Sequence, residues 1–383
     1  MRNKDGSTMT VNHPLRGART VVVNRNGRAI VATGAHGGYV QRPYVVRGGR
    51  TYVQRTYVVN NVTYTSVYRS YGYGGYCCYY GYVPAYYYGP AYYGWAYNPW
   101  AAPVYYGPAA WGWAGAPWYA YYGFTPYPVY PSAAFWLTDY LLAANLQAAY
   151  AAQADANTAA VGQAYASGVA AGQAQAAASA PPDGGDASAQ PAPGATAQVQ
   201  LTPQVKQMIS DEVKVQLAAE QSAASQAPPA QSSAQMPDAL NPAERIFIAS
   251  SSLDVTASTG QQCGLTPGDV LMRMTDQPDQ NQQVNASVQT SKQADCATGT
   301  TVAVGVQDLQ EMHNQFRQQI DAGMKTLADK GGQNGLPKAP DTSQKAGEVP
   351  PPAADPSASA QLAGALQDAD LTEKSVQQSG SGS

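Results

Sequence analysis

The residues with the greatest capacity for chemistry in this 383-residue chain are three histidines and four cysteines. His13, His36 and His313 stand far apart, and none has a serine or cysteine partner in a recognisable nucleophile motif. The HExxH, GxSxG and CxxC patterns are absent, and the glycine-rich GYGGY and GPAYYG runs do not join a strand to a helix, as phosphate-binding loops do. The sequence therefore predicts no enzymatic activity and no cofactor, and it favours a flanking position for His313 on its helix.

The cysteines fall into two pairs. Cys263 and Cys296 lie 33 positions apart around a strand-rich region, a spacing that suits one structural disulfide. Two free buried thiols are the alternative, and a zinc site is disfavoured because no other Cys or nearby His completes the ligands. Because a structural disulfide persists only in an oxidising compartment, this pair predicts an extracytoplasmic protein. Cys77 and Cys78 are adjacent, and the sequence leaves open a bond to another chain, weak binding of a soft metal, or a reduced pair.

Basic residues gather near the N-terminus, although the net charge of the whole chain is −3. Residues 1–70 contain 11 Lys/Arg and a single acid, Asp5. Tyrosines are interleaved with four of these arginines, which are Arg42, Arg47, Arg50 and Arg55. Such a surface can bind phosphate backbones or stack on bases. We favour an anionic envelope polymer or membrane surface over nucleic acid, because the rest of the chain has no nucleic-acid-binding fold signature.

These arginines must be positioned by β-strands. Residues 19–34 have the pattern of a hairpin about Asn26-Gly27, a dipeptide that favours the positive φ angles of a tight turn. A repeat follows, in which the pattern of residues 39–46 recurs at 52–59, with Gly-Gly and Asn-Asn pairs in turn positions. The sequence therefore predicts a meander of short β-strands with the arginines on one face.

The next segment is unusually aromatic. All 28 Tyr and all six Trp precede residue 166, and no Lys or Arg occurs between Ser70 and Val205. In residues 71–132 a Gly or Pro recurs every few positions, which prevents long helices and central strands. We expect the rings to pack on one another and on prolines, with the Tyr hydroxyls partly solvated. A surface with so little charge also allows self-association through this segment.

Two helices are predicted after the aromatic segment. The Ala-rich stretch 133–152 approaches membrane length, but it contains an Asp, an Asn and a Gln, which favour a buried or interfacial helix over a spanning one. A second helix begins at Thr202 and Pro203, residue types suited to the N-cap and the first helical position. The apolar stripe of this second helix is Val205, Met208, Ile209, Val213 and Leu217.

The C-terminal half contains the segment that is most typical of a conventional small domain. Four or five strand-like runs lie between Arg245 and Gln307, and a helix follows them. Asp308 and Glu311 predict a capping box at the start of this helix, and Gly331 is suited to its C-cap. The residues beyond are rich in Pro, Ala, Ser and Asp, a composition that predicts disorder.

The predicted fold class is therefore multi-segment α+β. One continuous core is disfavoured because the large aromatic residues are concentrated in the first half of the chain. The segments are a tail (1–18), a basic β-meander (19–70), a Tyr/Trp/Gly/Pro-rich segment (71–132), an Ala-rich helix (133–178), a linker (179–200), an amphipathic helix (201–222), a second linker (223–240), a small β-barrel module with one helix (241–332) and a disordered tail (333–383).

The run CGLTPGDVLMRM, at 263–274, resembles the PDZ stretch of bacterial envelope proteases and secretion factors, in which GL-x-x-GD precedes an apolar strand. The resemblance implies a small barrel-like fold that binds a peptide by adding it as a further strand. This sequence departs from the pattern at 277–289, where the short helix that walls the peptide groove has no clear counterpart. The residues implied in peptide binding are Ile246, Phe247, Ile248, Gly264, Leu265, Gly268 and Asp269.

A second resemblance covers roughly residues 20–340. The runs YGWAYNPW (93–100), FWLTDYL (135–141), TPQVKQMISDEV (202–213) and LQEMHNQFRQQIDAG (309–323) are similar to a family of uncharacterised secreted or envelope proteins of environmental bacteria. This resemblance implies a location and no particular activity.

Together these features predict a non-enzymatic scaffold or interaction protein that is envelope-associated or secreted. Its expected partner is a protein, a peptide or an anionic envelope polymer. The alternatives are a PDZ-like module that adds a client strand, and polyanion binding by the Arg/Tyr meander. The first residues have no apolar signal region, so this prediction takes Met1 as an internal or mis-assigned start, and a cytoplasmic protein is the alternative.

Overall fold

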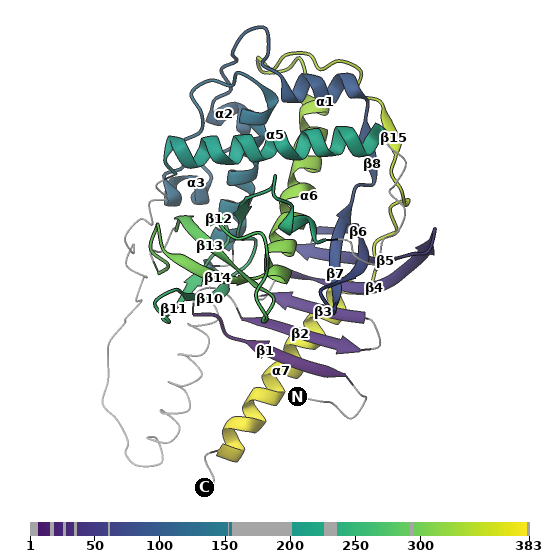
Figure 1. Cartoon of the computed structure of the whole chain (residues 1–383), viewed down its shortest axis with the longest axis vertical. Helices are drawn as coiled ribbons and strands as arrows, with labels where there is room; N and C mark the ends of the chain where they lie inside the picture. The colour runs from purple at the N-terminus through teal and green to yellow at the C-terminus, as the bar shows by residue number, and fades with distance from the viewer. Residues whose placement is uncertain are drawn as a thin grey trace, which may run out of the picture.

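The structure is a computed structural model that describes residues 7–15, 19–25, 28–33, 37–59, 62–151, 153–154, 201–225, 236–291 and 295–380. Several sequence predictions lie outside these residues: the turns at Asn26-Gly27 and Asn60-Asn61, His36, the Ala-rich helix beyond residue 154, the linker 179–200 and most of the linker 223–240. Within the described residues the fold is mixed α+β, as predicted, with two large antiparallel sheets and helices packed around them (Figure 1).

The N-terminal sheet is a seven-stranded meander in which each strand pairs with the next along the chain. Its strands are β1 (Thr8–Asn12), β2 (Thr20–Arg25), β3 (Arg28–Thr33), β4 (Gly37–Arg47), β5 (Arg50–Val59), β6 (Val62–Tyr73) and β7 (Tyr76–Val83). Val, Thr and Tyr dominate these strands because branched and aromatic side chains suit a pleated surface. Gly48 and Gly49, with φ angles of +56° and +74°, form the tight turn between β4 and β5.

This sheet extends beyond the predicted meander at both ends. Strand β1 lies in the predicted tail, where an alternation of only five residues is too short to be recognised without its partner strand. Strand β7 lies in the aromatic segment, at the edge of the sheet, where glycine is tolerated. Gly74 and Gly75, with φ angles of +60° and +80°, make the hairpin that returns the chain from β6.

The rest of the aromatic segment forms short elements, namely β8 (Tyr86–Tyr88), α1 (Pro90–Tyr97), α2 (Pro108–Trp111) and α3 (Pro117–Tyr122). Each helix begins at a proline, whose fixed φ suits the first helical position. The rings pack on one another as predicted: Trp111 stacks on both Trp113 and Trp136, with centroid distances of 4.2 and 4.3 Å. Trp136 is fully buried, so this aromatic core anchors the predicted Ala-rich helix, which is observed at 133–151.

Two long helices follow, α5 (Pro203–Ser225) and α6 (Val306–Lys330). Helix α5 begins as predicted, because the Thr202 hydroxyl accepts a hydrogen bond from the Val205 N–H at 3.3 Å. Helix α6 begins at Val306 with Gly305 as its N-cap, so the predicted capping box at Asp308 is wrong. The physical reason is that a strand runs directly into the helix, and the Val306 N–H is bonded to the Gln282 carbonyl at 2.9 Å. The predicted C-cap of α6, Gly331, is observed.

The predicted strand-rich module contains a second antiparallel sheet, with the order β11-β10-β14-β13-β12-β9. Its strands are β9 (Ile246–Ile248), β10 (Leu253–Ala257), β11 (Gln262–Leu265), β12 (Val270–Arg273), β13 (Gln283–Thr290) and β14 (Thr301–Gly305), and a short helix, η1 (Asp238–Leu240), precedes them. Alternate residues of β13, such as Val284 and Val288, share a buried cluster with Leu309 and Met312 of α6. The sheet and α6 therefore form one α+β unit.

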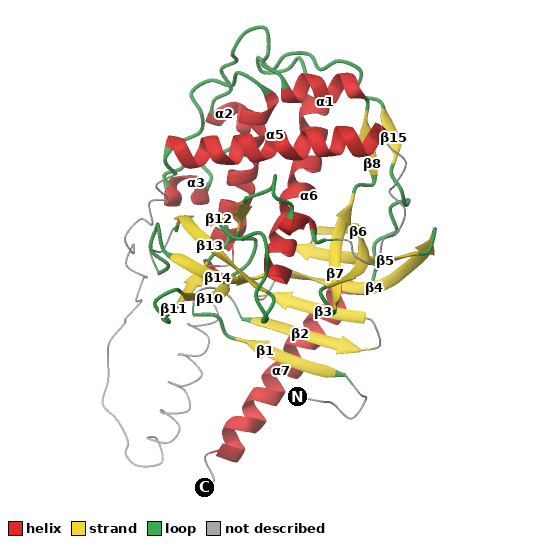
Figure 2. Cartoon of the chain, viewed as in Figure 1, coloured by secondary structure: helices red, strands yellow, loops and turns green. Residues whose placement is uncertain are grey.

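The C-terminal segment is not disordered, and that prediction is wrong. Strand β15 (Gln344–Ala346) pairs with β8, and α7 (Ala358–Gly380) lies against the N-terminal sheet (Figure 2). Small and apolar residues spaced three or four apart on α7 contact Val21, Ala32 and Val40 of the sheet. These α7 residues are Ala358, Leu362, Ala365 and Ala369. Their modest hydrophobicity explains why composition alone suggested a solvated tail.

Candidate functional site

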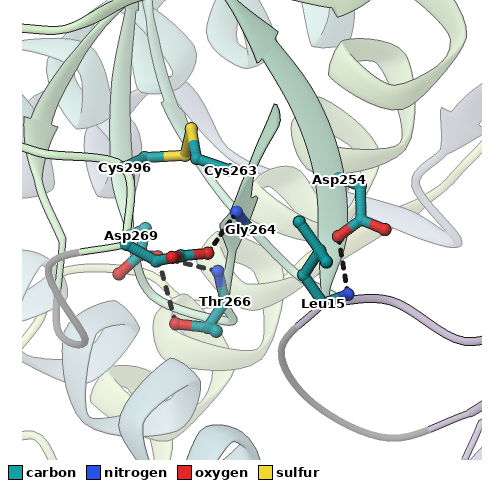
Figure 3. Close-up of a disulfide and its surroundings, with 8 residues drawn as sticks. Leu15, Asp254, Cys263, Gly264, Thr266, Asp269 and Cys296 are labelled. Atoms are coloured by element: carbon teal, nitrogen blue, oxygen red, sulfur yellow. Dashed lines mark hydrogen bonds between the residues drawn. A yellow bond between two sulfur atoms is a disulfide. The ribbon is translucent and has the colours of Figure 1, made fainter. Parts of the chain in front are cut away.

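The predicted disulfide is formed in the second sheet. Cys263 and Cys296 are bonded, with their Cα atoms 5.2 Å apart, and both side chains are buried (Figure 3). Beside the bridge, the Asp269 carboxylate accepts hydrogen bonds from the N–H and hydroxyl of Thr266 at 2.7 and 3.0 Å. Gly268 precedes this aspartate with a φ of +89°, which favours glycine. The other two cysteines, Cys77 and Cys78, are bonded to each other.

The strand predicted to receive a peptide is at the edge of the second sheet. Phe247 pairs with Leu271 of β12, which leaves the Ile246 N–H facing the outer side of β9. A carboxylate from α5 occupies that side: Glu212 accepts the N–H groups of Arg245 and Ile246 at 3.0 and 3.1 Å. Burial raises the pKa of Glu212 to about 7, against the lowering effect of these hydrogen bonds.

The residues that the PDZ resemblance groups together are only partly neighbours. Gly268 and Asp269 bond the backbone of Ala249, directly after β9. Gly264 and Leu265 belong to β11, which stands at the opposite end of the strand order from β9. Of the residues predicted to bind a peptide, Gly268 and Asp269 therefore lie next to the receiving strand β9, whereas Gly264 and Leu265 lie at the far edge of the same sheet.

The four predicted anion-binding arginines do not share one face, which corrects the prediction for the meander. Arg50 and Arg55 are five positions apart on β5, so strand alternation directs them to opposite faces. Arg55 is fully buried and makes two hydrogen bonds to Glu311 of α6, at 2.5 and 2.8 Å. Its guanidinium also lies 4.2 Å from the ring centroid of Tyr68. Arg55 is therefore a structural link between the sheet and α6.

The other three arginines contact the C-terminal segment. Arg50 and the hydroxyl of Tyr52 both bond the Glu348 carboxylate, and Arg47, which is exposed, donates to the Glu348 carbonyl at 2.8 Å. Arg42 pairs with Asp355 at 2.5 Å. Burial alone would raise the pKa of Asp355, but hydrogen bonds from Ser357 and the charge of Arg42 lower it below its ordinary value.

Helix α7 continues this pattern along the same sheet. Arg19 pairs with Asp370 at 2.7 Å and with Glu373 at 2.6 Å, and His13 also contacts Glu373 at 2.6 Å. Four acids of the C-terminal segment thus contact arginines or a histidine of the N-terminal sheet region, and the apolar stripe of α7 packs beside them. Sequence reasoning missed this site because the paired acids and bases lie 298 to 360 positions apart. The available signal was the recurrence of acidic residues along 348–373.

A second group of charges is buried between α5, α6 and η1. His313 is buried, contrary to its predicted flanking position, and its Nε2 lies 2.6 Å from the Glu244 carboxylate. Burial would raise the pKa of Glu244, but His313 lowers it. Burial raises the pKa of Asp321 to about 6, although the Tyr82 hydroxyl donates to it at 2.7 Å. Each of these groups has its own partner inside the protein, His313 with Glu244 and Asp321 with Tyr82, which favours a packing role.

The comparisons with known proteins add no assignment: no family model, curated protein or solved structure matches the chain. Among the described residues, no group of three or more His, Cys, Asp or Glu side chains is arranged to hold a metal ion. A search of the same residues finds no helix that combines the length and the apolar character needed to cross a membrane. Among the described residues, the protein is thus a mixed α+β protein in which charged side chains link the C-terminal segment to the N-terminal sheet.

Proposed function

We propose that the protein is a non-enzymatic scaffold, envelope-associated or secreted, that binds an acidic helical segment on its N-terminal sheet. The observation that carries this proposal is the contact between residues 347–373 and strands β1–β5. That contact combines carboxylates paired with Arg19, Arg42 and Arg50 with an apolar stripe on α7, as a peptide–protein interface does. The protein's own C-terminal segment then occupies a surface that an acidic partner can share.

A cleavable form of the full chain tests this proposal. A protease site inserted at 341–343, where the chain has no helix or strand, separates the C-terminal segment after the protein has folded. A labelled peptide of residues 344–380 should then exchange into the site, with an affinity that falls as salt rises. A matched peptide with Gln or Asn in place of Glu348, Asp355, Asp370 and Glu373 should bind at least tenfold more weakly. Equal binding of the two peptides, or no exchange at millimolar concentration, would refute the proposal.

Polyanion binding is the second candidate, and Arg47 favours it because this residue is exposed and its guanidinium bonds a backbone carbonyl instead of a carboxylate. An anionic envelope polymer would compete with Glu348 and Asp355 for the same arginines. In the cleaved protein, polyphosphate should displace the labelled peptide if the site accepts any dense anion. Displacement by the acidic peptide alone would favour a protein partner.

The PDZ-like alternative has narrower support. Its receiving strand, Ile246–Ile248, stands at a sheet edge, and the Gly268–Asp269 turn lies next to it. An incoming strand would have to displace the Glu212 carboxylate from the Ile246 N–H. Titration of the full chain with a library of C-terminal peptides tests this alternative, with a Phe247→Asp variant as the control.

A further inference from the structure

Lys206 of α5 meets Asp139 of the helix 133–151 inside the aromatic part of the protein. The Lys206 Nζ lies 2.6 Å from Asp139 Oδ1. The Asp139 side chain is fully buried, and the Lys206 side chain is 7% exposed. The ammonium group also donates to the Thr125 carbonyl at 3.1 Å and lies 3.8 Å from the ring centroid of Tyr127. A nucleophilic nitrogen and a carboxyl group are therefore held in contact, away from bulk water.

The second oxygen of the carboxyl group is held by two donors. Asp139 Oδ2 accepts the Tyr127 N–H at 2.5 Å and the Tyr130 hydroxyl at 2.8 Å. Burial and the neighbouring Asp139 raise the pKa of Tyr130, so its hydroxyl stays protonated and remains a donor. Two donors on one oxygen are the arrangement that stabilises negative charge developing there during attack on a carbonyl carbon.

The environment also favours the uncharged forms of both groups. Burial raises the pKa of Asp139, although Lys206 opposes this shift. Burial lowers the pKa of Lys206, although Asp139 opposes this second shift. Because each shift brings one group closer to its neutral state, proton transfer from the ammonium to the carboxylate is easier here than in water.

We propose that Lys206 and Asp139 are joined by an amide bond that forms within the folded protein. A proton moves from Nζ to Oδ1, which yields an amine and a carboxylic acid. The nitrogen lone pair attacks Cγ, and the C=O electron pair moves to Oδ2, where Tyr127 and Tyr130 donate. Two protons, including the one transferred first, leave with Oδ1 as water when the Cγ–Oδ1 bond breaks. The step consumes one ammonium and one carboxylate, releases one water and needs no other reactant.

The chain offers an internal comparison in another Lys–Asp pair. Lys325 and Asp329 are 2.8 Å apart, a distance close to that of the buried pair, but their side chains are 55% and 62% exposed. Water keeps that pair charged and competes with any attack on the carboxyl carbon. The proposal therefore assigns a cross-link to the buried pair and none to the exposed one.

Intact mass spectrometry of the full-length protein tests the proposal. After denaturation, reduction and alkylation, the folded preparation should be about 18 Da, the mass of one water, lighter than the mass calculated for the sequence with all four cysteines alkylated. The matched control is Lys206→Arg, which keeps a cation beside Asp139 but has no amine that forms this amide, and it should show the full mass. Lys325→Arg should retain the loss.

Trypsin supplies a second readout, because the sequence has no Lys or Arg between Arg69 and Lys206. An acylated Lys206 resists trypsin, so the fragment that starts at Ser70 should end at Lys214 instead. Chymotrypsin should release a branched peptide that contains both Asp139 and Lys206. Full mass with normal cleavage after Lys206, in wild-type protein that unfolds cooperatively, would overturn the proposal. A water loss that persists in Lys206→Arg would overturn it as well.

Discussion

The buried carboxylate of Glu212 should make stability depend on pH in a specific window. Its folded pKa of about 7 lies above its ordinary value of 4.5, so the native state retains a proton that the unfolded chain releases. The stabilisation that is linked to the proton on Glu212 is fully present below about pH 4.5, and it is lost as the pH rises through about 7. A difference of this size corresponds to about 3 kcal/mol for a residue that is only 5% exposed.

The substitution Glu212→Gln removes the titration and keeps an oxygen that can accept the N–H groups of Arg245 and Ile246. The free energy of unfolding of the variant, relative to wild type, should therefore rise by about 2–3 kcal/mol between roughly pH 5 and pH 8. Urea unfolding at both pH values measures this change. Subtracting the free energy of unfolding of wild type from that of the variant cancels the pH-dependent contributions of the other buried carboxylates, such as Asp321.

The control is Asp211→Asn, which removes an exposed carboxylate from the same helix and should change stability by less than about 0.5 kcal/mol at either pH. Identical pH dependence in wild type and Glu212→Gln would refute the reasoning. That outcome would mean that Glu212 is ionised in the folded protein at neutral pH, with a pKa close to its ordinary value.

Three further predictions concern the links between segments. Replacing both Cys263 and Cys296 by Ser should lower stability by roughly 3–4 kcal/mol on the loop-entropy model. Free thiols at both positions in protein from its native host would refute the disulfide, and they would weaken the proposal that the protein is extracytoplasmic. Gly268→Val should lower the melting temperature of the full chain because φ is +89° there, and an unchanged value would refute the turn assignment. Arg55→Met should lower stability by about 2–3 kcal/mol in urea unfolding, because it removes the charge-assisted hydrogen bonds to Glu311, whose side chain is 33% exposed. The matched variant at an exposed arginine, Arg47→Gln, should change stability by less than about 0.5 kcal/mol.

The sequence predicted those parts of the fold that depend on local signals. The meander, the proline-initiated α5 and the strand-rich module with its disulfide all follow from short patterns of turns, caps and alternation. It failed where a contact depends on distant residues. Nothing near Arg55 indicates that its partner, Glu311, lies 256 positions away, and the Ala-rich stripe of α7 becomes meaningful only opposite Val21 and Val40.

The alternation of β5 explains why only one face of the N-terminal sheet is suited to exchange. Arg55 faces α6. Helix α6 in turn makes buried contacts through His313 with Glu244 and through Arg317 with Glu220. Breaking the contact between α6 and the sheet would therefore separate the sheet from the rest of the core. Arg50 faces the C-terminal segment, which reaches the sheet after an extended stretch and ends with α7 (Figure 2). Replacing that segment by an acidic helix of similar pattern would leave every α6 contact in place. A partner can therefore compete for the Arg50 side without dismantling the core, and this asymmetry favours a scaffold that binds through its C-terminal side.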